Sequence, residues 1–414
     1  MGLENNIPED WIQATLGDVC ENISRRFNFQ DKETVVFVNT GDVSNGKFLH
    51  HKKISKKGLP GQAKKAIKIG DILYSEIRPK NKRFAIVDFD SQDYVVSTKF
   101  MVLKRNDKID LDFFYLFLKS NKTINAFQSH AEARSGTFPQ ITFDTISLDE
   151  INLPPLPEQK AIANVLTAFD DKIELLQAQN KTLETIAKTI FKEWFGKYQI
   201  GDELPEGWRV GKLGDIANLK SGYAFKSKEF VEESSKKALK IKDLKGDGKV
   251  SLNAVSCVSN DVTKLSRVQY FRLKEGDIVL AMSGNTTGKI GVIPPHSNEV
   301  YLNQRVGKFF MIKQDLNSFL YSFLMSGNYE EKILSMGYGS AQPNISPSQI
   351  ENIDIIYPNE EKLVSFLNIS NPIFNKVLDN NNQIQSLTKT RDTLLPKLMS
   401  GQVRVNNIKQ TADA

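Results

Sequence analysis

The feature that most constrains the fold of this chain is an internal repeat with a period of roughly 200 residues. The two copies match at their openings, in their middles and near their ends. The matching segments are PEDW (8–11) with PEGW (205–208), LGD (16–18) with LGD (213–215), KIGDIL (68–73) with KEGDIV (274–279), and FPQI (138–141) with QPNI (342–345). A period this long predicts duplicated domains rather than the short stacked units of a solenoid.

The first copy is followed by a segment with the pattern of a long amphipathic helix, residues 158–195. Its apolar or small residues recur at steps of three and four, as one face of a helix requires and a strand does not. These residues are Ile162, Leu166, Phe169, Ile173, Leu176, Leu183, Ala187, Ile190 and Trp194. Pro155 and Pro157 are start signals and Gly196 is a stop signal. A helix of this length spans roughly 55 Å, and its single apolar face needs a partner.

The second copy is followed by the best candidate for that partner, residues 359–400. Its apolar stripe consists of Leu363, Leu367, Phe374, Val377, Ile384, Leu387, Leu394 and Leu398. Pro372 is predicted to start a new helix after a break at Asn371, and Pro396 is predicted to bend the last turn.

Packing the two segments together places Asn180 opposite Asn381 inside an otherwise apolar seam. A buried asparagine in a coiled coil can fix its register, whereas an exposed asparagine on a frayed stripe is the alternative. The shortest connection makes the two helices antiparallel. The two copies would then be related by an approximate two-fold axis.

Each copy reads as a mixed α/β domain, because short strand-like runs alternate with loops rich in Gly, Asn and Lys. The expected strands include residues 34–39, 85–89, 97–103, 277–281 and 306–312, and short buried helices are expected at 112–119 and 318–325. The predicted fold is therefore two similar α/β domains joined by two long helices that pack as an antiparallel coiled coil. The predicted boundaries are 1–157 and 200–358 for the domains, 158–199 and 359–404 for the helices, and 405–414 for a frayed tail.

The composition is that of an ordinary soluble protein, with 40% hydrophobic and 25% charged residues in 414. No apolar run approaches the ~20 residues of a membrane helix, and the N-terminus lacks the pattern of a signal peptide. We therefore expect a cytoplasmic location. Two lone cysteines suit a reducing compartment, and the four histidines show no ligand spacing, so no metal site is expected.

The net charge of +6 is unevenly distributed. Residues 43–70 contain no acidic side chain, and this stretch carries Lys47, Lys52, Lys53, Lys56, Lys57, Lys64, Lys65 and Lys68 beside His50 and His51. Such a block attracts a polyanion, although a solvated lysine-rich loop is an equal alternative. An elongated protein with a similar domain at each end suits DNA, whose half-sites match two-fold proteins.

No catalytic or cofactor-binding constellation is recognisable. Residues 283–290 (SGNTTGKI) resemble a phosphate loop, but the spacing is one residue short and Ile290 stands where Ser or Thr would bind magnesium. Residues 371–374 (NPIF) resemble the loop of adenine methyltransferases without its second proline, and helix initiation explains them better. We expect no bound cofactor and no enzymatic activity in this chain.

Candidate DNA contacts lie on loops that mix long hydrogen-bond donors with small residues. Arg and Lys can bond guanine edges, Asn and Gln adenine edges, and Ser or Thr a base edge or a phosphate. The candidates are Arg78, Lys80, Asn81, Lys82, Arg83, Arg134, Thr137 and Gln140 in the first copy, and Lys220, Tyr223, Ser283, Asn285, Thr286, Thr287, Lys289, Gln304, Arg305 and Gln342 in the second. Ordinary solvated loops remain the alternative at each position.

Four sequence features together resemble a known family. They are LPEQKAIA (156–163), FKEWF (191–195), the Trp-x-x-x-x-Leu-Gly-Asp entry to each copy, and LLPKLMSG (394–401). The chain resembles, over essentially its whole length, the specificity (S) subunit of a prokaryotic type I restriction–modification system.

The resemblance implies two target recognition domains, each reading one half of a bipartite, asymmetric DNA sequence. It further implies that the helices set the spacer and dock two methyltransferase (modification) subunits, which two restriction (motor nuclease) subunits join. S-adenosylmethionine, ATP and Mg²⁺ would belong to those partners. Trp194 and Phe195 are expected to pack between the helices or to anchor a partner.

A coiled-coil scaffold that binds proteins is the alternative function. Salt dependence distinguishes the two, because contacts with phosphates weaken steeply as the salt concentration rises.

Overall fold

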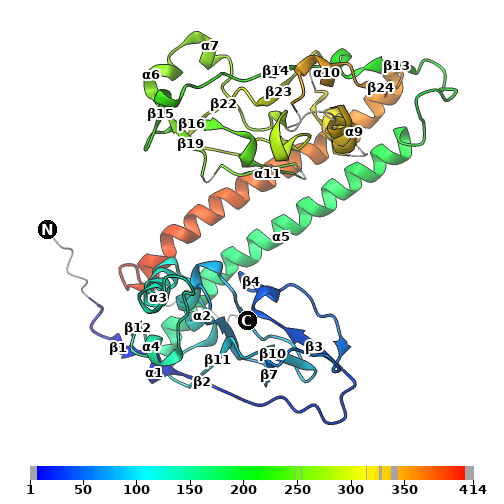
Figure 1. Ribbon diagram of the computed structural model, residues 1–414. Coiled ribbons are helices and arrows are strands. Elements are labelled where there is room, and N and C mark those ends of the chain that lie inside the picture. The colour runs from blue at the N-terminus through cyan, green and yellow to red at the C-terminus, as the bar shows by residue number, and fades with distance from the viewer. Residues whose placement is uncertain are drawn as a thin grey trace, which may run out of the picture. The chain divides into compact units, whose positions relative to one another are not determined.

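The computed structural model describes residues 7–246, 248–252, 254–313, 315–325, 329–336 and 344–405. The chain divides into two compact units (Figure 1), and each contains one copy of the repeat. Unit 1 comprises Met1–Asp171 and Thr388–Ala414, and unit 2 comprises Lys172–Leu387.

Unit 1 is built on a two-stranded ribbon, two four-stranded sheets and a small hairpin. The ribbon pairs β1 (Ile12–Thr15) with β12 (Glu150–Leu153). One sheet has the order β2 (Cys20–Asn22), β11 (Phe100–Arg105), β8 (Ile72–Ser75), β9 (Phe84–Ile86), and the other β6 (Ile54–Ser55), β3 (Thr34–Val38), β10 (Tyr94–Ser97), β7 (Ala63–Ala66). The hairpin is β4 (Val43–Ser44) with β5 (Lys47–Phe48), and the helices are α1 (Leu16–Val19), α2 (Leu111–Lys119), α3 (Asn121–Arg134) and α4 (Phe143–Ile146).

The core of unit 1 lies between the β8 sheet, α2 and the long helices. Asp110 caps α2 by accepting hydrogen bonds from the backbone of Asp112 and Phe113, both at 3.1 Å. The apolar side chains of α2 then pack with Ile162 and Leu166 of α5 (Leu156–Phe195), and with Leu398 of α11 (Glu360–Met399). Unit 1 therefore uses both long helices as part of its core.

Unit 2 repeats the ribbon, the first sheet and the hairpin, but its second sheet has a different strand order, because the parallel pair lies at an edge in unit 2 and in the centre in unit 1. Its ribbon pairs β13 (Arg209–Lys212) with β24 (Asp354–Tyr357). Its sheets have the orders β14 (Ala217–Ser221), β23 (Val306–Met311), β20 (Ile278–Ala281), β21 (Ile290–Val292) and β15 (Phe230–Val231), β19 (Ser256–Val258), β16 (Lys236–Leu239), β22 (Glu299–Leu302). Its hairpin is β17 (Leu244–Gly246) with β18 (Lys249–Val250), and its helices are α6 (Asn260–Thr263), α7 (Ser266–Gln269), α8 (Asn317–Met325), α9 (Tyr329–Met336) and α10 (Pro347–Glu351).

Individual hydrogen bonds recur at matching positions of the two copies. The amide of Leu16 donates to the carbonyl of Asp149 at 2.9 Å, and the amide of Leu213 donates to that of Ile353 at 2.8 Å. Each second sheet also contains one parallel pair, β10 with β3 in unit 1 and β16 with β22 in unit 2. The predicted pair of similar α/β domains is confirmed.

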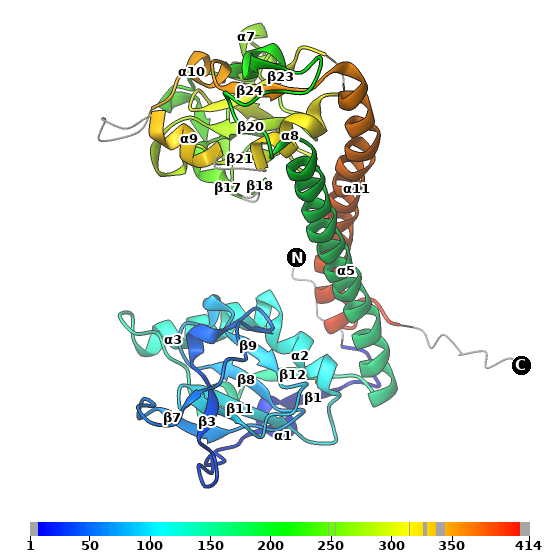
Figure 2. The same cartoon turned by 90° about the vertical axis from the view of Figure 1, so that its right-hand side faces the viewer.

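In unit 2, α5 and α11 run side by side (Figures 1 and 2) and contact each other in antiparallel order. The amide nitrogen of Asn180 donates to Asn381 Oδ1 at 2.8 Å, and that of Asn380 donates to Asn180 Oδ1 at 2.8 Å. Lys362 Nζ lies 3.6 Å from the ring centroid of Trp194. Contacts later in α5 are therefore made with earlier residues of α11, as in antiparallel helices. Asn180 is 8% exposed and Asn380 is fully buried. The predicted pairing of Asn180 with Asn381 is confirmed, and the alternative of an exposed Asn180 is wrong.

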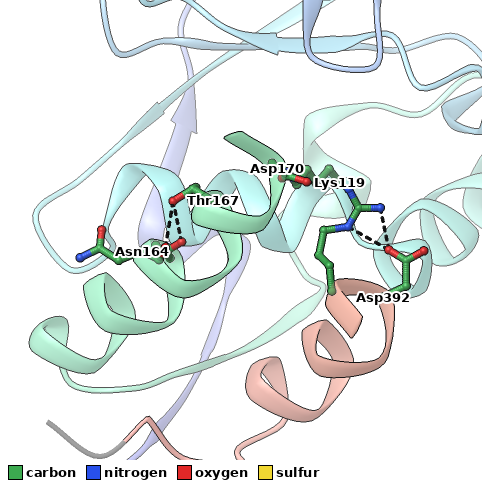
Figure 3. A network of polar contacts seen from close by, with 7 residues as sticks. Lys119, Asn164, Thr167, Asp170 and Asp392 are labelled. Carbon is green, nitrogen blue, oxygen red and sulfur yellow. Dashed lines mark hydrogen bonds and ion pairs between the residues drawn. The ribbon is translucent and has the colours of Figure 1, made fainter. Parts of the chain in front are cut away.

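In unit 1, a polar network joins the same two helices to α2 (Figure 3). Asp170 accepts hydrogen bonds from Lys119 of α2 and Arg391 of α11, each at 2.6 Å. Arg391 also donates to Asp392 at 2.7 and 2.9 Å. One carboxylate of α5 thus binds two cations from separate elements, which fixes these elements against each other.

The start of α5 is held by a second network in unit 1. Glu158, which is 7% exposed, accepts a hydrogen bond from the indole of Trp11 at 3.2 Å. Arg404 donates to both oxygens of Glu158 at 2.6 and 2.7 Å, and to both oxygens of Asp10 at 2.9 and 2.7 Å. The residues that follow α11 are thereby tied to the entry of the first copy.

The predicted break of the second helix at Asn371 is wrong, because α11 continues through Pro372. A proline inside a helix removes one backbone hydrogen bond and costs about 3 kcal/mol. Packing of the neighbouring side chains offsets this loss. Ser318 of α8 lies 2.7 Å from the Ser370 hydroxyl and donates to Asn371 Oδ1 at 2.6 Å, while Phe374 is buried.

Local structure also differs from the sequence-based expectation at three places in unit 1. The strand expected at 97–103 is two strands, because β10 ends at Ser97 and β11 begins at Phe100. The strand expected at 85–89 is β9, which ends at Ile86, and α3 was not predicted. The sequence of α3 is mostly polar and only a narrow face of the helix is apolar, so its helical periodicity is weak. Of the tail predicted at 405–414, residues 406–414 lie outside the described residues.

The aromatic residues at the end of α5 pack inside unit 2. Phe191 and Phe195 are 5% and 4% exposed, and the Phe195 ring lies 5.1 Å from Phe366 of α11 and 5.6 Å from Phe319 of α8. The expectation that these residues pack against the second helix is confirmed. A buried Phe195 cannot anchor a partner chain in this conformation, so that alternative is wrong for this residue.

The Asp170 network makes the stability of the chain depend on pH. Burial raises the pKa of Asp170, but the hydrogen bonds and positive charges of Lys119 and Arg391 lower it by a larger amount. The pKa of Asp170 therefore lies below its ordinary value of 3.8. A carboxyl group whose pKa is lower in the folded than in the unfolded chain stabilises the fold at any pH above its unfolded pKa. This stabilisation is lost as the pH falls through the folded pKa. We predict that Asp170→Asn lowers the free energy of unfolding by about 1–3 kcal/mol at pH 7.

The difference in the free energy of unfolding between Asp170→Asn and the wild type should shrink as the pH falls below about 4. Urea titrations at several pH values measure it. The exposed neighbour Asp171 serves as the control through Asp171→Asn, which should change stability by less than about 0.5 kcal/mol. A pH-independent difference would contradict the prediction.

Candidate nucleic-acid interface

In unit 1, the structure brings the two predicted loops together. Residues 78–83 connect β8 to β9, and residues 134–140 follow α3. The backbone amide of Arg78 donates to the Pro139 carbonyl at 3.0 Å, and Ile77 forms a bridge with Gln140. The exposed candidates on this joined surface are Arg78, Lys80, Asn81, Lys82, Arg134 and Thr137.

The 78–83 loop has a tightly defined backbone. Arg78 and Lys82 adopt left-handed conformations with φ of 45° and 53°, which L side chains rarely adopt. Between them lies the 3₁₀ turn Pro79–Asn81, and the amide of Lys80 donates to Gln128 of α3 at 3.1 Å. The left-handed residues at both ends and the contact with α3 fix the backbone of this turn. Four exposed polar side chains project from it, those of Arg78, Lys80, Asn81 and Lys82.

Two of the unit 1 candidates have partners within the protein. Arg83 donates to the Thr40 hydroxyl at 3.3 Å, and Gln140 donates to Glu76 at 2.7 Å. Both side chains are half-buried. In this conformation their side chains bind other residues of unit 1 and stabilise the two loops.

The β4–β5 hairpin is a third component of this surface that sequence reasoning missed. Its tip packs on the 78–83 loop, because the amide of Asn45 donates to the Lys82 carbonyl at 2.7 Å and that of Gly46 donates to the Phe84 carbonyl at 2.9 Å. The Asn45–Gly46 dipeptide is a strong hairpin signal. That signal could have located the hairpin.

The lysine-rich stretch of unit 1 is partly neutralised. Lys53 forms an ion pair with Asp93 at 2.6 Å, and Lys56 lies 3.5 Å from Glu33. Lys65 donates to the Phe100 carbonyl at 2.6 Å, and burial lowers its pKa. The exposed lysines of this stretch include Lys52, Lys57, Lys64 and Lys68. The candidate basic surface is therefore smaller than the sequence suggested.

Unit 2 places its matching loop in the same way. Residues 283–289 connect β20 to β21, and Ser283 forms a bridge with Asn344, as Ile77 does with Gln140 in unit 1. The amide of Ile345 donates to the Met282 carbonyl at 2.9 Å. Within the loop, Asn285 is exposed on the turn Gly284–Thr286, and Thr286 and Lys289 are half-buried.

Two candidates of this loop face inward. Ser283 and Thr287 are 6% and 2% exposed, and the Thr287 hydroxyl donates to the Gly284 carbonyl at 2.6 Å. In this conformation they shape the turn rather than present a polar group to a ligand. Gln342 lies outside the described residues.

The remaining unit 2 candidates meet beside this loop. The amide of Gln304 donates to the Tyr223 carbonyl at 3.0 Å, and the amide of Met282 donates to the Arg305 carbonyl at 3.0 Å. Gln304, Arg305 and Lys220 are exposed. The β17–β18 hairpin is again next to the loop, since a Cβ on Gly246 would lie 3.7 Å from the Lys289 side chain, and the amide of Val292 in β21 donates to the Gly248 carbonyl at 2.9 Å. It adds the exposed Lys245 and Lys249, and the exposed Lys242 lies just before it; these lysines were not predicted as contacts.

A glycine–tyrosine contact anchors the hairpin in both units. Gly46 and Gly248 have φ of 92° and 72°, which favours glycine. A Cβ on Gly46 would lie 2.7 Å from the Tyr115 hydroxyl of α2, and a Cβ on Gly248 would overlap the Tyr321 hydroxyl of α8. The same close approach recurs in both copies, so the position of each hairpin depends on it.

The two segments that resembled enzyme motifs have other structural roles. The 283–290 segment joins two antiparallel strands through a 3₁₀ turn, so it lacks the helix N-terminus that a phosphate loop uses. Residues 371–374 lie inside α11. Among the described residues, no group of three or more His, Cys, Asp or Glu side chains could hold a metal ion. None of the described helices is long and apolar enough to cross a membrane.

Both copies match a known family model, described as the type I restriction modification DNA specificity domain, over residues 8–185 and 205–388. The chain belongs to this family.

Among its relatives, the type I restriction enzyme HindI specificity subunit of Haemophilus influenzae is 34% identical, over 95% of this chain and 100% of that protein. The MjaIX specificity subunit of Methanocaldococcus jannaschii is 26% identical, over 97% of this chain and 95% of that protein. The fold is similar to the crystal structure of a type I restriction–modification S subunit from M. genitalium, with a TM-score of 0.60, 19% identity, and coverage of 96% of this chain and 98% of that one.

The hairpin anchor generates a prediction about stability. Gly46→Ala forces an alanine into the left-handed region and against Tyr115, and it should lower the free energy of unfolding by about 1–3 kcal/mol. The double variant Gly46→Ala/Tyr115→Phe should recover part of the loss, because it removes the hydroxyl that a Cβ would meet. Thermal unfolding measures both.

Gly41→Ala is the matched control, because no atom lies within 4 Å of a Cβ built at Gly41. It should be nearly neutral. Equal melting temperatures for Gly46→Ala and Gly41→Ala would contradict the prediction.

Proposed function

We propose that this chain is the DNA sequence-specificity subunit of a type I restriction–modification complex. Each unit reads one half of a bipartite, asymmetric site in double-stranded DNA. The chain itself transfers no methyl group and cleaves no DNA. The observation that carries this proposal is the repeated surface, in which both copies place a polar loop, a hairpin and a third segment next to one another.

The chemistry of the repeated surface suits DNA better than it suits a protein partner. Its exposed side chains are long donors and amides, such as Lys80 and Asn81 in unit 1 and Asn285 and Arg305 in unit 2. Lysine and arginine neutralise phosphates, and asparagine can form two hydrogen bonds with adenine. A scaffold that binds proteins would favour a larger apolar centre in the same place. Family membership also favours the DNA-reading function over the scaffold.

Differences between the two copies would make the recognised site asymmetric. The loop of unit 1 carries the sequence RPKNKR (78–83), and the matching loop of unit 2 carries SGNTTGK (283–289). Similar backbones thus present different donors and acceptors, which select different bases. This combination of a shared scaffold with unlike loops is what a bipartite asymmetric site requires.

The long helices have two roles in the proposal. Paired as an antiparallel coiled coil with approximate two-fold symmetry, they set the spacer between the half-sites, and they dock the methyltransferase subunits. The buried contacts of Asn180 with Asn380 and Asn381 support a single register, because a shifted register would leave these amides unpaired in an apolar seam.

The proposed assembly contains two modification and two restriction subunits, and it works in the prokaryotic cytoplasm. S-adenosylmethionine, ATP and Mg²⁺ would be bound by those partner chains. Purified alone, the chain should bind DNA without transferring methyl groups or hydrolysing ATP.

Mapping methylated adenines in host DNA with and without this chain tests the proposal. The wild-type chain should direct methylation to one bipartite sequence. Asn81→Ala should relax the half-site read by unit 1, and Asn285→Ala the half-site read by unit 2, each at about 1–3 kcal/mol per lost base contact.

Asn368→Ala, at an exposed asparagine of α11 away from these loops, is the control and should leave both half-sites unchanged. Methylation that ignores sequence, or that does not depend on the chain, would refute the proposal. Binding to duplex DNA that does not weaken between low and high salt would favour the scaffold instead.

The spacer role gives a separate prediction. Inserting about one heptad into each long helix, at facing positions, preserves the apolar seam and lengthens the pair by roughly 10 Å. The methylated sequence should then have a longer nonspecific spacer and unchanged half-sites. Altered half-sites with an unchanged spacer would contradict this role of the helices.

A further inference from the structure

One aromatic side chain in unit 1 is more exposed than any other large apolar side chain in the described part of the chain. Phe138 is 77% exposed. It lies in the loop that follows α3 and precedes α4. Exposure of an aromatic ring to water is unfavourable for the free protein, and burial of the ring against a ligand would remove this cost.

The backbone on both sides of Phe138 is fixed. Its amide donates to the Ser135 hydroxyl at 3.2 Å, and the carbonyl of the next residue, Pro139, accepts from the Arg78 amide at 3.0 Å. Pro139 is itself buried, and Ile141 donates to the Glu76 carbonyl at 2.9 Å. The exposed ring is therefore held on a defined support and loses little backbone freedom when it binds.

The surroundings of the ring are cationic. Within the described ranges, no aromatic ring or cation lies against either face of Phe138. Arg78, Lys80 and Arg134 are exposed on the same joined loops, and Arg78 donates to the carbonyl of Thr137 at 3.4 Å. An apolar partner protein would have to desolvate these cations. A duplex instead offers phosphates to the cations and flat apolar base faces to the ring.

We propose that Phe138 inserts between two adjacent base pairs of the half-site read by unit 1, while Arg78 and Arg134 contact the flanking phosphates. This inference rests on the proposed function and specifies how that site works. Insertion of an apolar side chain partly unstacks one base step and bends the duplex. Flexible pyrimidine–purine steps accept such a deformation most readily. Phe138 would thus select sequence at a step where it forms no hydrogen bond.

The test uses the full-length chain assembled with its methyltransferase partner, and duplexes that carry the mapped site. 2-Aminopurine, whose fluorescence is quenched by stacking, replaces one base at a time across the half-site read by unit 1, except at the methylated adenine and its neighbours, because extrusion of that base by the methyltransferase would brighten the probe by itself. Wild-type protein should brighten the probe several-fold at one step. Phe138→Ala should abolish this signal and weaken binding roughly ten-fold or more, whereas Phe138→Leu should keep part of both effects.

Leu148→Ala is the matched control, because Leu148 is 75% exposed in the same unit but lies on the turn before β12. It should bind and brighten the probe like the wild type. Since Phe138 is exposed, its replacement should leave the melting temperature unchanged, and this is measured alongside.

Two results would overturn the insertion while leaving the proposed function in place. One is specific binding by the wild type with no brightened position, and the other is unchanged affinity and signal in Phe138→Ala. Replacing thymine by uracil detects the competing mode, a contact between the ring and a thymine methyl group. Loss of affinity on that replacement without unstacking would also overturn the insertion. If the wild-type assembly shows no site preference, the proposed function itself fails.

Discussion

Both units depend on the antiparallel contact between α5 and α11. Ile162 and Leu166 of α5 join Leu398 of α11 in the core of unit 1, and Phe191 and Phe366 do the same in unit 2. Burying each such side chain contributes roughly 1.5–3 kcal/mol. Neither domain therefore has a complete core without segments of both helices, and this explains why each helix follows directly after a domain copy. The polar contacts of Asn180 and Asp170 add what the apolar seam lacks, a specific register, because each has fixed partners on the opposite helix.

This arrangement separates rigidity from recognition. The β8 sheet with α2 in unit 1 and the β20 sheet with α8 in unit 2 form the scaffold that the two copies share, and the polar loops lie at matching strand ends. The contacts of Gly46 with Tyr115 and of Gly248 with Tyr321 bring a hairpin to each loop in the same way. Loop sequences can then differ between the copies without changing the support beneath them. Binding residues on loops held by a rigid scaffold are a common solution to this requirement, and the arrangement suits the proposed reading of two unlike half-sites with one fold.

The candidate site illustrates where sequence reasoning succeeds and where it stops. The exposed positions of Lys80, Asn81, Asn285 and Arg305 agree with a loop that presents donors to a ligand. Ser283 and Thr287 have residue types of the same kind, yet their side chains turn inward. Polar residue type and loop location do not specify the direction of a side chain. The direction depends on backbone angles and on neighbouring strands that are distant in the sequence, such as the segment at Asn344 that pairs with Ser283.

The sequence by itself determined the duplication, the α/β character of each copy, the two long helices and the pairing of Asn180 with Asn381. The helices and the α/β character follow from local signals, namely periodicity and capping residues, whereas the duplication and the asparagine pairing follow from aligning two similar segments of the sequence. Only the tertiary structure decided that α11 continues through Pro372, that the β4–β5 hairpin joins the candidate interface, and that Arg404 binds Glu158 and Asp10. Each of these depends on contacts between residues far apart in the chain. Their free energy outweighs the local preference of a proline or a loop, and a one-dimensional pattern does not contain it.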